Sequence, residues 1–321
     1  MSVKTEALKI IKEKYAERLL SVKGITGIGV NGSIIVYTER LTPKLSQFIP
    51  KTLDGVRVRV VETGKIRPLS FPIVSAIYAD RTSRFRPTVP GGCSIGAPDI
   101  TAGTFTGRIV IGGEVYGLSN NHILSGEWGT HPASEVGTVI YQPGVYDSGG
   151  PGDEIGSLEK WVPVKLDKPN LVDSAIFKSE ILSEDILEVG KPGQTIEPRA
   201  GMVIKKSGRS SGLTYSRLID VDATVKVDGW GEATFTDVCI AKPALGIPGD
   251  SGSWCGSEND ETAAQLFAGS TEVTVLGKAV NIERLFNGEI IPPLPYLSAR
   301  VMLPWGAVFA LGSILSSRRW K

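Results

Sequence analysis

The part of the chain between residues 89 and 288 consists of many short apolar runs separated by turn residues. Examples are "GTFTGRIVI", "GTVIYQPG", "MVIKKSG" and "LFAGSTEVTVLGKAVNI". The 38 glycines and 20 prolines of the chain are scattered between such runs instead of forming tracts. Short strands at even spacing, joined by tight turns, are typical of a sandwich or a barrel, and helical periodicity is almost absent here. The sequence therefore predicts a mainly β fold for this region.

Residues 1–88 have a different pattern, which predicts a small α+β domain. Apolar residues recur at three- and four-residue steps in the first 20 residues, at Leu8, Ile11, Tyr15 and Leu19. This spacing predicts an amphipathic helix from Val3 to Leu20. Two β-branched runs then flank Asn31-Gly32, which is a hairpin signal, and "GVRVRVVETG" alternates Val with Arg at the period of a strand.

Two segments without periodicity suggest where the domains end. The run "RTSRFRPTVPGG", from Arg81 to Gly92, mixes charge, Pro and Gly as a linker does. We therefore expect three parts, residues 1–88, 89–288 and 289–321. The last part holds a Pro-rich linker and an apolar tail, Val301 to Leu315, which is shorter than the roughly 20 residues that span a bilayer. We expect the tail to pack against the protein or to mediate self-association, with membrane contact as the alternative.

The charge balance excludes some classes of partner. The chain has 35 Lys and Arg against 34 Asp and Glu, for a formal net charge of +1. Proteins that bind nucleic acid or anionic membranes usually carry a clear excess of basic residues, so we expect no nucleic-acid partner. The start "MSVKTEALKIIKEKY" contains no apolar signal region, so we expect a cytoplasmic protein.

The cysteines support the same expectation. Cys93, Cys239 and Cys255 cannot all pair within one chain. Cys239 and Cys255 could form a disulfide if the fold brings them together, but free thiols are expected in a reducing compartment. No two cysteines have CxxC spacing and the chain has only 2 histidines, so we expect neither a metal site nor a cofactor.

The stretch "IPGDSGSWC" carries the strongest chemical signal. Its Ser251 lies between Gly249 and Gly252, which allow a sharp turn whose backbone amides converge on one point. A serine hydroxyl is a poor nucleophile at neutral pH, so it needs an imidazole base, a carboxylate that orients the imidazole, and donors for the oxyanion. His122 in "YGLSNNHIL" and Asp173 in "NLVDSAIFK" each lie at the end of a strand-like run. Taken alone, either residue could be structural, as a packed histidine or a turn or capping aspartate.

The three signals occur in the order His, Asp, Ser. "SNNHIL", "VDSAIF" and "PGDSGS" resemble the histidine, aspartate and nucleophile motifs of the trypsin and chymotrypsin superfamily. Further stretches, among them "GGCSIGAPDITAGT", "YQPGVYD" and "KKSGRSSGLT", resemble an intracellular-looking bacterial and archaeal group in which an α+β segment precedes the protease. The resemblance covers roughly residues 24 to 286. It implies two six-stranded β-barrels with the active site between them.

The resemblance also implies roles for individual residues. His122 is the general base, Asp173 orients it and Ser251 is the nucleophile, while the backbone amides of Gly249 and Ser251 form the oxyanion hole. The function implied is that of a serine endopeptidase acting on a protein or peptide substrate. The alternative is a protease-derived binding or assembly module whose active site is silent or occluded.

Two residues next to the nucleophile raise separate questions. Pro248 departs from many family members and either preorganises or distorts the loop. In secreted members, the acid that matches Asp250 pairs with a new N-terminal ammonium released by cleavage. No comparable junction is evident near Gly91, so we expect Asp250 to find another donor and the enzyme not to be activated by cleavage.

The resemblance gives a partial view of specificity. Leu245 matches the floor of the pocket that accepts the residue before the cut, and a leucine cannot neutralise a buried Lys or Arg. The alternative is that Leu245 is simply a core residue. Gly269, Ser270 and Thr271 resemble the strand edge that hydrogen-bonds an extended substrate. We expect a preference for small or apolar residues, and we expect "KKSGRSSGLT" to be a solvated hairpin without a catalytic role.

Overall fold

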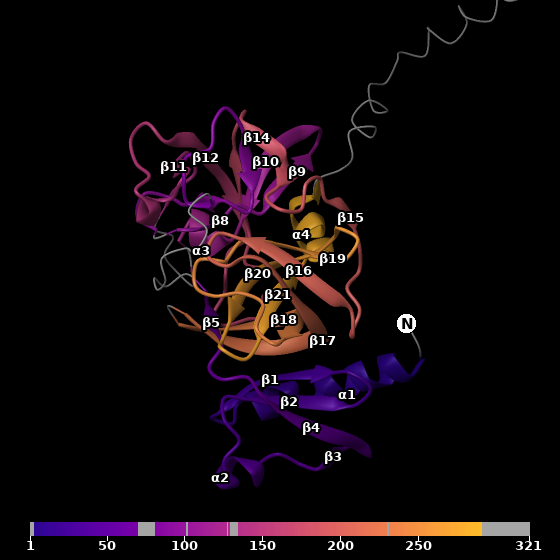
Figure 1. Ribbon diagram of the computed structural model, residues 1–321. Helices are drawn as coiled ribbons and strands as arrows, with labels where there is room; N and C mark the ends of the chain where they lie inside the picture. Colours follow the sequence, from indigo (N-terminus) through magenta and orange to yellow (C-terminus); the bar gives the residue numbers. More distant parts are fainter. Residues whose placement is uncertain are drawn as a thin grey trace, which may run out of the picture.

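The computed structural model describes residues 3–69, 81–100, 102–126, 128, 134–229 and 231–290. The apolar tail predicted at residues 301–315 lies outside this range. Strands dominate the described part of the chain, so the prediction of a mainly β protein is confirmed. Figure 1 shows the N-terminal elements on one side of a strand-rich body that contains two sheet units.

The unit next to the N-terminal elements is a closed ring of six strands. Each strand pairs with the next, and pairing between the first and the last completes the ring, in the order β16 (Val203–Gly208), β19 (Trp254–Ser257), β20 (Glu261–Gly269), β21 (Thr274–Lys278), β18 (Glu232–Lys242) and β17 (Gly212–Asp228). Two short strands, β15 (Gly193–Thr195) and β5 (Arg67–Pro68), add to β20. We refer to this ring as the closed barrel.

The second unit is a six-stranded sheet, which is consistent with the implied second six-stranded barrel, although among the described residues its two end strands are not paired with each other. Its strands are, in spatial order, β11 (Val139–Tyr141), β12 (Glu154–Trp161), β13 (Ala175–Lys178), β10 (Glu114–Ser119), β9 (Gly107–Ile111) and β22 (Gly288–Ile290). Two short pairs accompany them, β6 (Val89–Gly91) with β14 (Leu182–Ile186) and β7 (Ser94–Ile95) with β8 (Gly103–Thr104). The helices of this body are α3 (Asn121–Leu124), the 3-10 turn η2 (Val145–Asp147) and α4 (Ala279–Phe286).

The N-terminal segment has the predicted helix and hairpin. Its elements are α1 (Val3–Leu20), β1 (Ile25–Val30), β2 (Ile34–Thr38), α2 (Pro43–Ser46), β3 (Thr52–Leu53) and β4 (Val56–Glu62). The turn between β1 and β2 contains Gly32 at φ 65°, a conformation that suits glycine. Leu8 and Leu19 of α1 are buried among the apolar residues of β1 and β2, as the helical periodicity predicts. Strand β1 also pairs with β17, so the N-terminal strands continue the sheet of the closed barrel.

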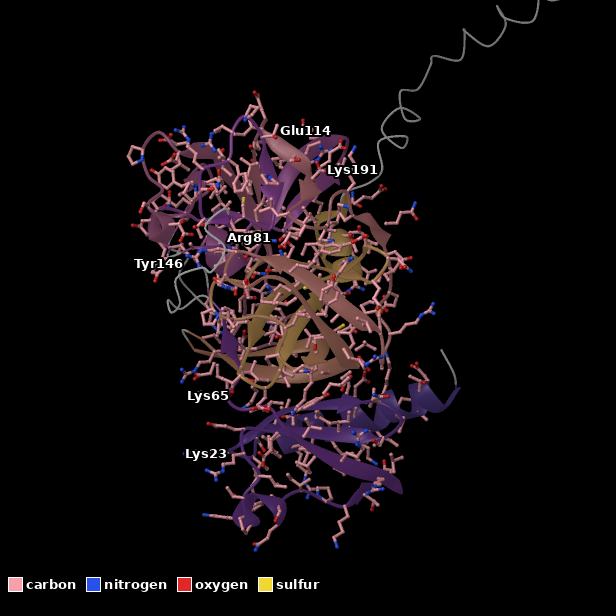
Figure 2. The ribbon with its side chains drawn as sticks, in the orientation of Figure 1. Lys23, Lys65, Arg81, Glu114, Tyr146 and Lys191 are labelled. Carbon is pink, nitrogen blue, oxygen red and sulfur yellow. The ribbon has the colours of Figure 1, made fainter. Side chains whose placement is uncertain are left out.

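The linker predicted from Arg81 to Gly92 is partly wrong. Residues 89–91 form β6, which pairs with β14, and Val89 is fully buried. The Arg81 guanidinium is also buried, because it donates to the Gly92 carbonyl and to the Ser207 hydroxyl (2.8 Å). Figure 2 places Arg81 within the body of the molecule. Charge and proline gave this run the appearance of a linker, although Arg81 donates hydrogen bonds to buried oxygen atoms.

The three cysteines are free and buried. Burial raises the pKa of each thiol, so the thiols stay protonated and unreactive. Within the part of the chain that the structure describes, no three His, Cys, Asp or Glu side chains are placed to hold a metal ion. No helix among the described residues is long and apolar enough to cross a membrane.

Candidate active site

His122 and Asp173 form a buried pair. His122 lies on α3, directly after β10, and Asp173 comes just before β13, which pairs with β10. The ring atom Nδ1 of His122 is hydrogen-bonded to Oδ2 of Asp173, and the backbone amide of His122 donates to Oδ1 at 3.1 Å. Because a carboxylate only accepts hydrogen bonds, Nδ1 carries the proton. The side-chain amide of Asn120 donates to the Asp173 carbonyl at 2.7 Å, which also fixes the aspartate.

The other ring nitrogen of His122, Nε2, is buried and has no hydrogen-bond partner among the described residues. The ring of Trp128 lies edge-on to the imidazole, with 6.3 Å between the centroids and an angle of 73° between the planes. A neutral imidazole that is protonated at Nδ1 has a free electron pair on Nε2, so this atom can accept a proton.

The nucleophile loop is a sharp turn between β18 and β19. Gly249 has φ 94° and Gly252 has φ 93°, values that glycine adopts without strain. A Cβ atom at Gly252 would lie 2.1 Å from the carbonyl oxygen of Thr104, so the loop packs tightly against β8. The backbone amide of Thr104 donates to the Ser251 carbonyl at 2.7 Å, and its hydroxyl donates to the Gly249 carbonyl at 2.9 Å. These bonds hold the nucleophile loop against the six-stranded sheet unit.

The same contacts place Ser251 near β10, the strand that leads into the histidine-bearing helix α3. Ser119, at the end of β10, donates from its hydroxyl to the Thr104 carbonyl at 2.7 Å. The Ser251 hydroxyl itself donates to the carbonyl of Phe267 at 3.3 Å, and its hydrogen bond to His122 Nε2 is not formed. The structure therefore assembles the His122–Asp173 pair and brings the serine loop to the same junction, with the hydroxyl turned toward β20.

Asp250 finds donors within the chain, as expected. Its carboxylate accepts hydrogen bonds from the backbone amides of Ser210 (2.9 Å), Ser211 (3.1 Å) and Ile247 (3.0 Å), and from the Ser211 hydroxyl (2.5 Å). The ammonium of Lys206 lies 3.2 Å from Asp250 Oδ2, and both side chains are fully buried. Burial lowers the pKa of Lys206, and the Asp250 carboxylate counteracts part of that shift.

The prediction of a solvated hairpin at "KKSGRSSGLT" is wrong. The hairpin exists, since β16 pairs with β17, but Lys206 is fully buried and Arg209 is only 4% exposed. The reason is that the hairpin covers the nucleophile loop, where Lys206 binds Asp250 and the Arg209 guanidinium binds Asp147. Two lysines in a polar run suggested solvent exposure, and only the fold reveals that Lys206 has a buried acidic partner. Lys206 is thus a site residue that the sequence interpretation missed.

The residues expected to bind substrate do lie together. A cavity of about 680 Å³ is lined by Leu245, Gly269, Ser270 and Thr271. Leu245 is 2% exposed and belongs to the apolar core of the closed barrel, so it is both a core residue and a cavity wall. None of the three candidate catalytic residues belongs to the lining of this cavity, which reaches Pro248 beside the nucleophile loop, or to that of a second cavity of about 750 Å³ near residues 196–203.

The cavity is shared with the N-terminal segment. Pro68 and Leu69 also line it, and β5 pairs with β20, where Gly269 faces Arg67. The amide of Gly249, expected as an oxyanion donor, donates to the carbonyl of Leu69 at 2.5 Å. An extended piece of the chain therefore lies on the strand edge where a substrate was expected.

Comparison with known proteins gives no match among protein-family models and none among curated proteins. Solved structures do resemble the chain. Thermobifida fusca Protease A is 13% identical and covers 63% of this chain and 98% of its own, with a TM-score of 0.47. Cellulomonas bogoriensis chymotrypsin is 11% identical, with coverages of 63% and 98% and a TM-score of 0.45. The Rv3671c protease from M. tuberculosis, in its active form, is 18% identical, with coverages of 66% and 87% and a TM-score of 0.37.

Proposed function

We propose that the chain is a serine endopeptidase that acts through an acyl-enzyme. One observation carries this proposal, namely that the buried imidazole of His122 is tied to Asp173 through Nδ1 while Nε2 is left without a partner among the described residues. A buried polar atom without a hydrogen bond destabilises the fold, so its presence calls for a functional explanation. Acceptance of the Ser251 proton provides that explanation.

The proposed first step begins at Ser251. Its 3.3 Å hydrogen bond to the Phe267 carbonyl is long for an O–H donor, so the hydroxyl leaves it at small cost. The hydroxyl then donates its proton to His122 Nε2, while the oxygen forms a bond to the substrate carbonyl carbon. Asp173 keeps Nδ1 protonated and stabilises the imidazolium that results. When the tetrahedral intermediate collapses, Nε2 returns the proton to the leaving amine.

The amides of Gly249 and Ser251 are the proposed donors to the oxyanion. Loss of one such donor typically lowers the rate on the order of a hundredfold. The loop that aims them depends on Asp250, whose carboxylate is saturated by hydrogen bonds from neighbouring amides and by Lys206. In this proposal the Lys206 ammonium takes the place of the N-terminal ammonium used by secreted members of the resembled superfamily.

The proposed substrate is a protein or peptide with a small or apolar residue before the cut. Leu245 presents an apolar wall to the cavity, and no acidic side chain among the described lining residues would compensate a buried Lys or Arg. Gly269 of β20 offers its backbone to an extended chain, and Ser270 and Thr271 line the same edge. We also propose that residues 1–88, 89–288 and 289–321 act as separate parts of a cytoplasmic protein.

A silent binding or assembly module is the second candidate function. One observation favours it, which is that the Gly249 amide already donates a hydrogen bond to the Leu69 carbonyl. In this case the N-terminal segment would block the cleft permanently and Ser251 would never react.

Labelling with a fluorophosphonate probe separates the two candidates. We expect the probe to label the full chain at Ser251, most readily when Leu69→Asp removes an apolar side chain from the wall of the cavity. Ser251→Ala and His122→Ala should lower labelling by at least about a thousandfold, because the nucleophile and its base act as a unit. Ser46→Ala, which alters an exposed serine of α2, is the matched control and should label like the unaltered chain. Absence of labelling in every form would favour the silent module.

A further inference from the structure

A chain of buried hydrogen bonds crosses the junction between the closed barrel and the six-stranded sheet unit. Gln265 lies on β20 of the closed barrel, and its side chain reaches two hydroxyls on the other side of the junction. One is that of Ser174, just before β13, and the other is that of Thr106, between β8 and β9, each at 2.7 Å. The Thr106 hydroxyl donates back to the carbonyl of Gly252 in the nucleophile loop at 2.5 Å. Gln265 therefore joins the sheet unit to this loop.

The two ends of this chain of hydrogen bonds lie next to the two halves of the candidate active site. Ser174 follows Asp173, whose carboxylate is hydrogen-bonded to His122. Gly252 follows Ser251. Because the imidazole and the serine hydroxyl come from different units, the distance between them depends on how the two units are packed together. The hydrogen bonds of Gln265 are placed to fix that packing.

The direction of each hydrogen bond follows from the groups that make it. Thr106 gives its hydroxyl proton to the Gly252 carbonyl, so its oxygen accepts from the side-chain amide nitrogen of Gln265. The Ser174 hydroxyl donates to the remaining polar atom, Oε1 of Gln265. A side-chain amide meets both demands because it carries a donor and an acceptor. Gln265 is 2% exposed, Thr106 is 1% exposed and Ser174 is fully buried. Removal of one group would therefore leave its buried partners unsatisfied.

We propose that Gln265 is a positioning residue, which holds the Asp173–His122 pair at the distance from Ser251 that proton transfer requires. This inference rests on the proposed function. Gln265 is not among the residues that line the cavity of about 680 Å³, so it acts on the geometry of the reacting groups and not on the binding of substrate. A misplacement of about 1 Å between reacting groups can lower a rate about a hundredfold.

Inactivation of the full chain by a fluorophosphonate, measured over a range of probe concentrations, tests the proposal. Gln265→Met keeps the approximate length of the side chain and removes both hydrogen bonds. We expect the rate at saturating probe to fall about ten- to a hundredfold. The probe concentration that gives half of this rate should stay unchanged, because the cavity is intact. A change in that concentration alone would overturn the inference, since Gln265 would then act on binding.

Further variants show whether the hydrogen bonds act as a unit. Ser174→Ala should also lower the saturating rate, and its combination with Gln265→Met should be no slower than Gln265→Met alone, because the bridge is already broken. Losses that multiply in the double variant would overturn the inference. Thr106→Val should lower the rate, whereas Thr106→Ser keeps the hydroxyl and should react like the unaltered chain. The single changes at Ser174 and Thr106 keep the test decisive if Gln265→Met does not fold.

Thr224→Val is the matched control for Thr106→Val. Thr224 is 7% exposed, its hydroxyl is hydrogen-bonded to that of Thr236 at 2.9 Å, and it lies on β17 opposite Ile28 of β1. We expect it to lower the urea midpoint of unfolding as Thr106→Val does and to leave the rate of inactivation unchanged. Equal losses of rate in the two valine variants would overturn the inference, because general destabilisation would explain them.

The same measurement separates failure of the inference from failure of the proposed function. Unchanged rates in both Gln265→Met and Thr106→Val would overturn the inference and leave the proposed function standing. If the unaltered chain is not labelled at Ser251 at any probe concentration, the proposed function fails and the inference fails with it.

Discussion

The N-terminal segment contacts the closed barrel at two sheet edges of different character. At β17, β1 pairs through Gly27 and Ile28, and buried polar side chains accompany the strands. Tyr37 donates to Asp220 at 2.8 Å, and the ammonium of Lys12 donates to the carbonyl of Asp222 at 2.8 Å. We refer to this contact as the β17 contact.

The contact at β20 rests mainly on backbone pairing and one apolar side chain. It includes the short β5 pairing, the hydrogen bond from Gly249 to the Leu69 carbonyl and the Leu69 side chain in an apolar cluster, and polar side chains contribute only at its edge, where Ser270 donates to the Thr63 carbonyl and Lys65 pairs with Asp228. We refer to it as the cleft contact. An extended peptide with an apolar residue at the right position could reproduce these interactions, whereas the β17 contact requires specific buried partners. The β17 contact is therefore suited to permanent attachment and the cleft contact to exchange with substrates.

Lys206→Met should have the largest effect on the free energy of unfolding and on the labelling of Ser251. It acts at the nucleophile loop, beside the cleft contact, and not at the β17 contact. Removal of the ammonium leaves the buried Asp250 carboxylate without its ion pair, a change that typically costs about 3 to 5 kcal/mol of unfolding free energy. The nucleophile loop then loses its geometry, so we expect labelling of Ser251 to fall at least about a hundredfold. Urea unfolding and fluorophosphonate labelling measure the two effects.

Lys205→Met provides the matched control for this change. The ammonium of Lys205 pairs with Asp260, whose side chain is 38% exposed, whereas Asp250 is fully buried, so loss of this ion pair should cost less than loss of the Lys206 pair. We expect a loss of no more than about 1 kcal/mol and unchanged labelling. Equal effects of the two variants would show that the Lys206–Asp250 pair has no special role in the loop.

Asp220→Asn tests the β17 contact through its pH dependence. Burial raises the pKa of Asp220 to about 6, and the residues facing it are Tyr37 of β2, Lys12 of α1 and Asp222 of β17. In the unfolded chain the carboxyl has its ordinary pKa of 3.8. The folded state thus holds the proton more tightly, and the stabilisation is fully present below the unfolded pKa and is lost as the pH rises through about 6.

The measurement compares the unfolding free energies of the two chains between pH 4 and pH 7. One pKa unit corresponds to about 1.4 kcal/mol, so the difference between the two free energies of unfolding should change by up to about 3 kcal/mol. The unaltered chain should become more stable relative to Asp220→Asn as the pH falls. Other carboxylates titrate in both chains and cancel in the difference. A difference that stays constant over this range would show that Asp220 has an ordinary pKa in the folded protein.

These contacts also show what the sequence could and could not predict. Local order was predictable, because the helix from Val3 to Leu20 and the turn at Asn31-Gly32 depend on spacing and turn chemistry within a few residues. The His122–Asp173 pair followed from recognisable motifs on two strands that pair. The burial of Lys206 was not predictable, since its acidic partner lies on another loop.

The cleft contact was equally hidden. Strand β5 contains only Arg67 and Pro68, which is too short to show any alternation, and proline argues against a central strand. Leu69 is one apolar residue at the end of a polar stretch. Its place against Gly249 depends on the whole N-terminal segment being held at β17, so no local pattern reports it.

The two contacts can be weakened separately at matched glycines. A Cβ atom at Gly29 would lie 1.7 Å from Asp220 Oδ2, so Gly29→Ala forces the β17 contact apart. A Cβ atom at Gly269 would lie 2.9 Å from the Val273 carbonyl and 3.3 Å from the Leu69 side chain, so Gly269→Ala crowds the cleft. Overpacking of this kind costs about 1 to 3 kcal/mol, and each variant serves as the control for the other.

The outcome should follow from the roles of the two contacts. Gly29→Ala should lower the free energy of unfolding and leave fluorophosphonate labelling of Ser251 unchanged, because the nucleophile loop lies at the other contact. Gly269→Ala should change the labelling of Ser251, because it crowds the edge beside Leu69 and the Gly249 amide. If Gly29→Ala changed the labelling as much as Gly269→Ala, the two contacts would not act separately.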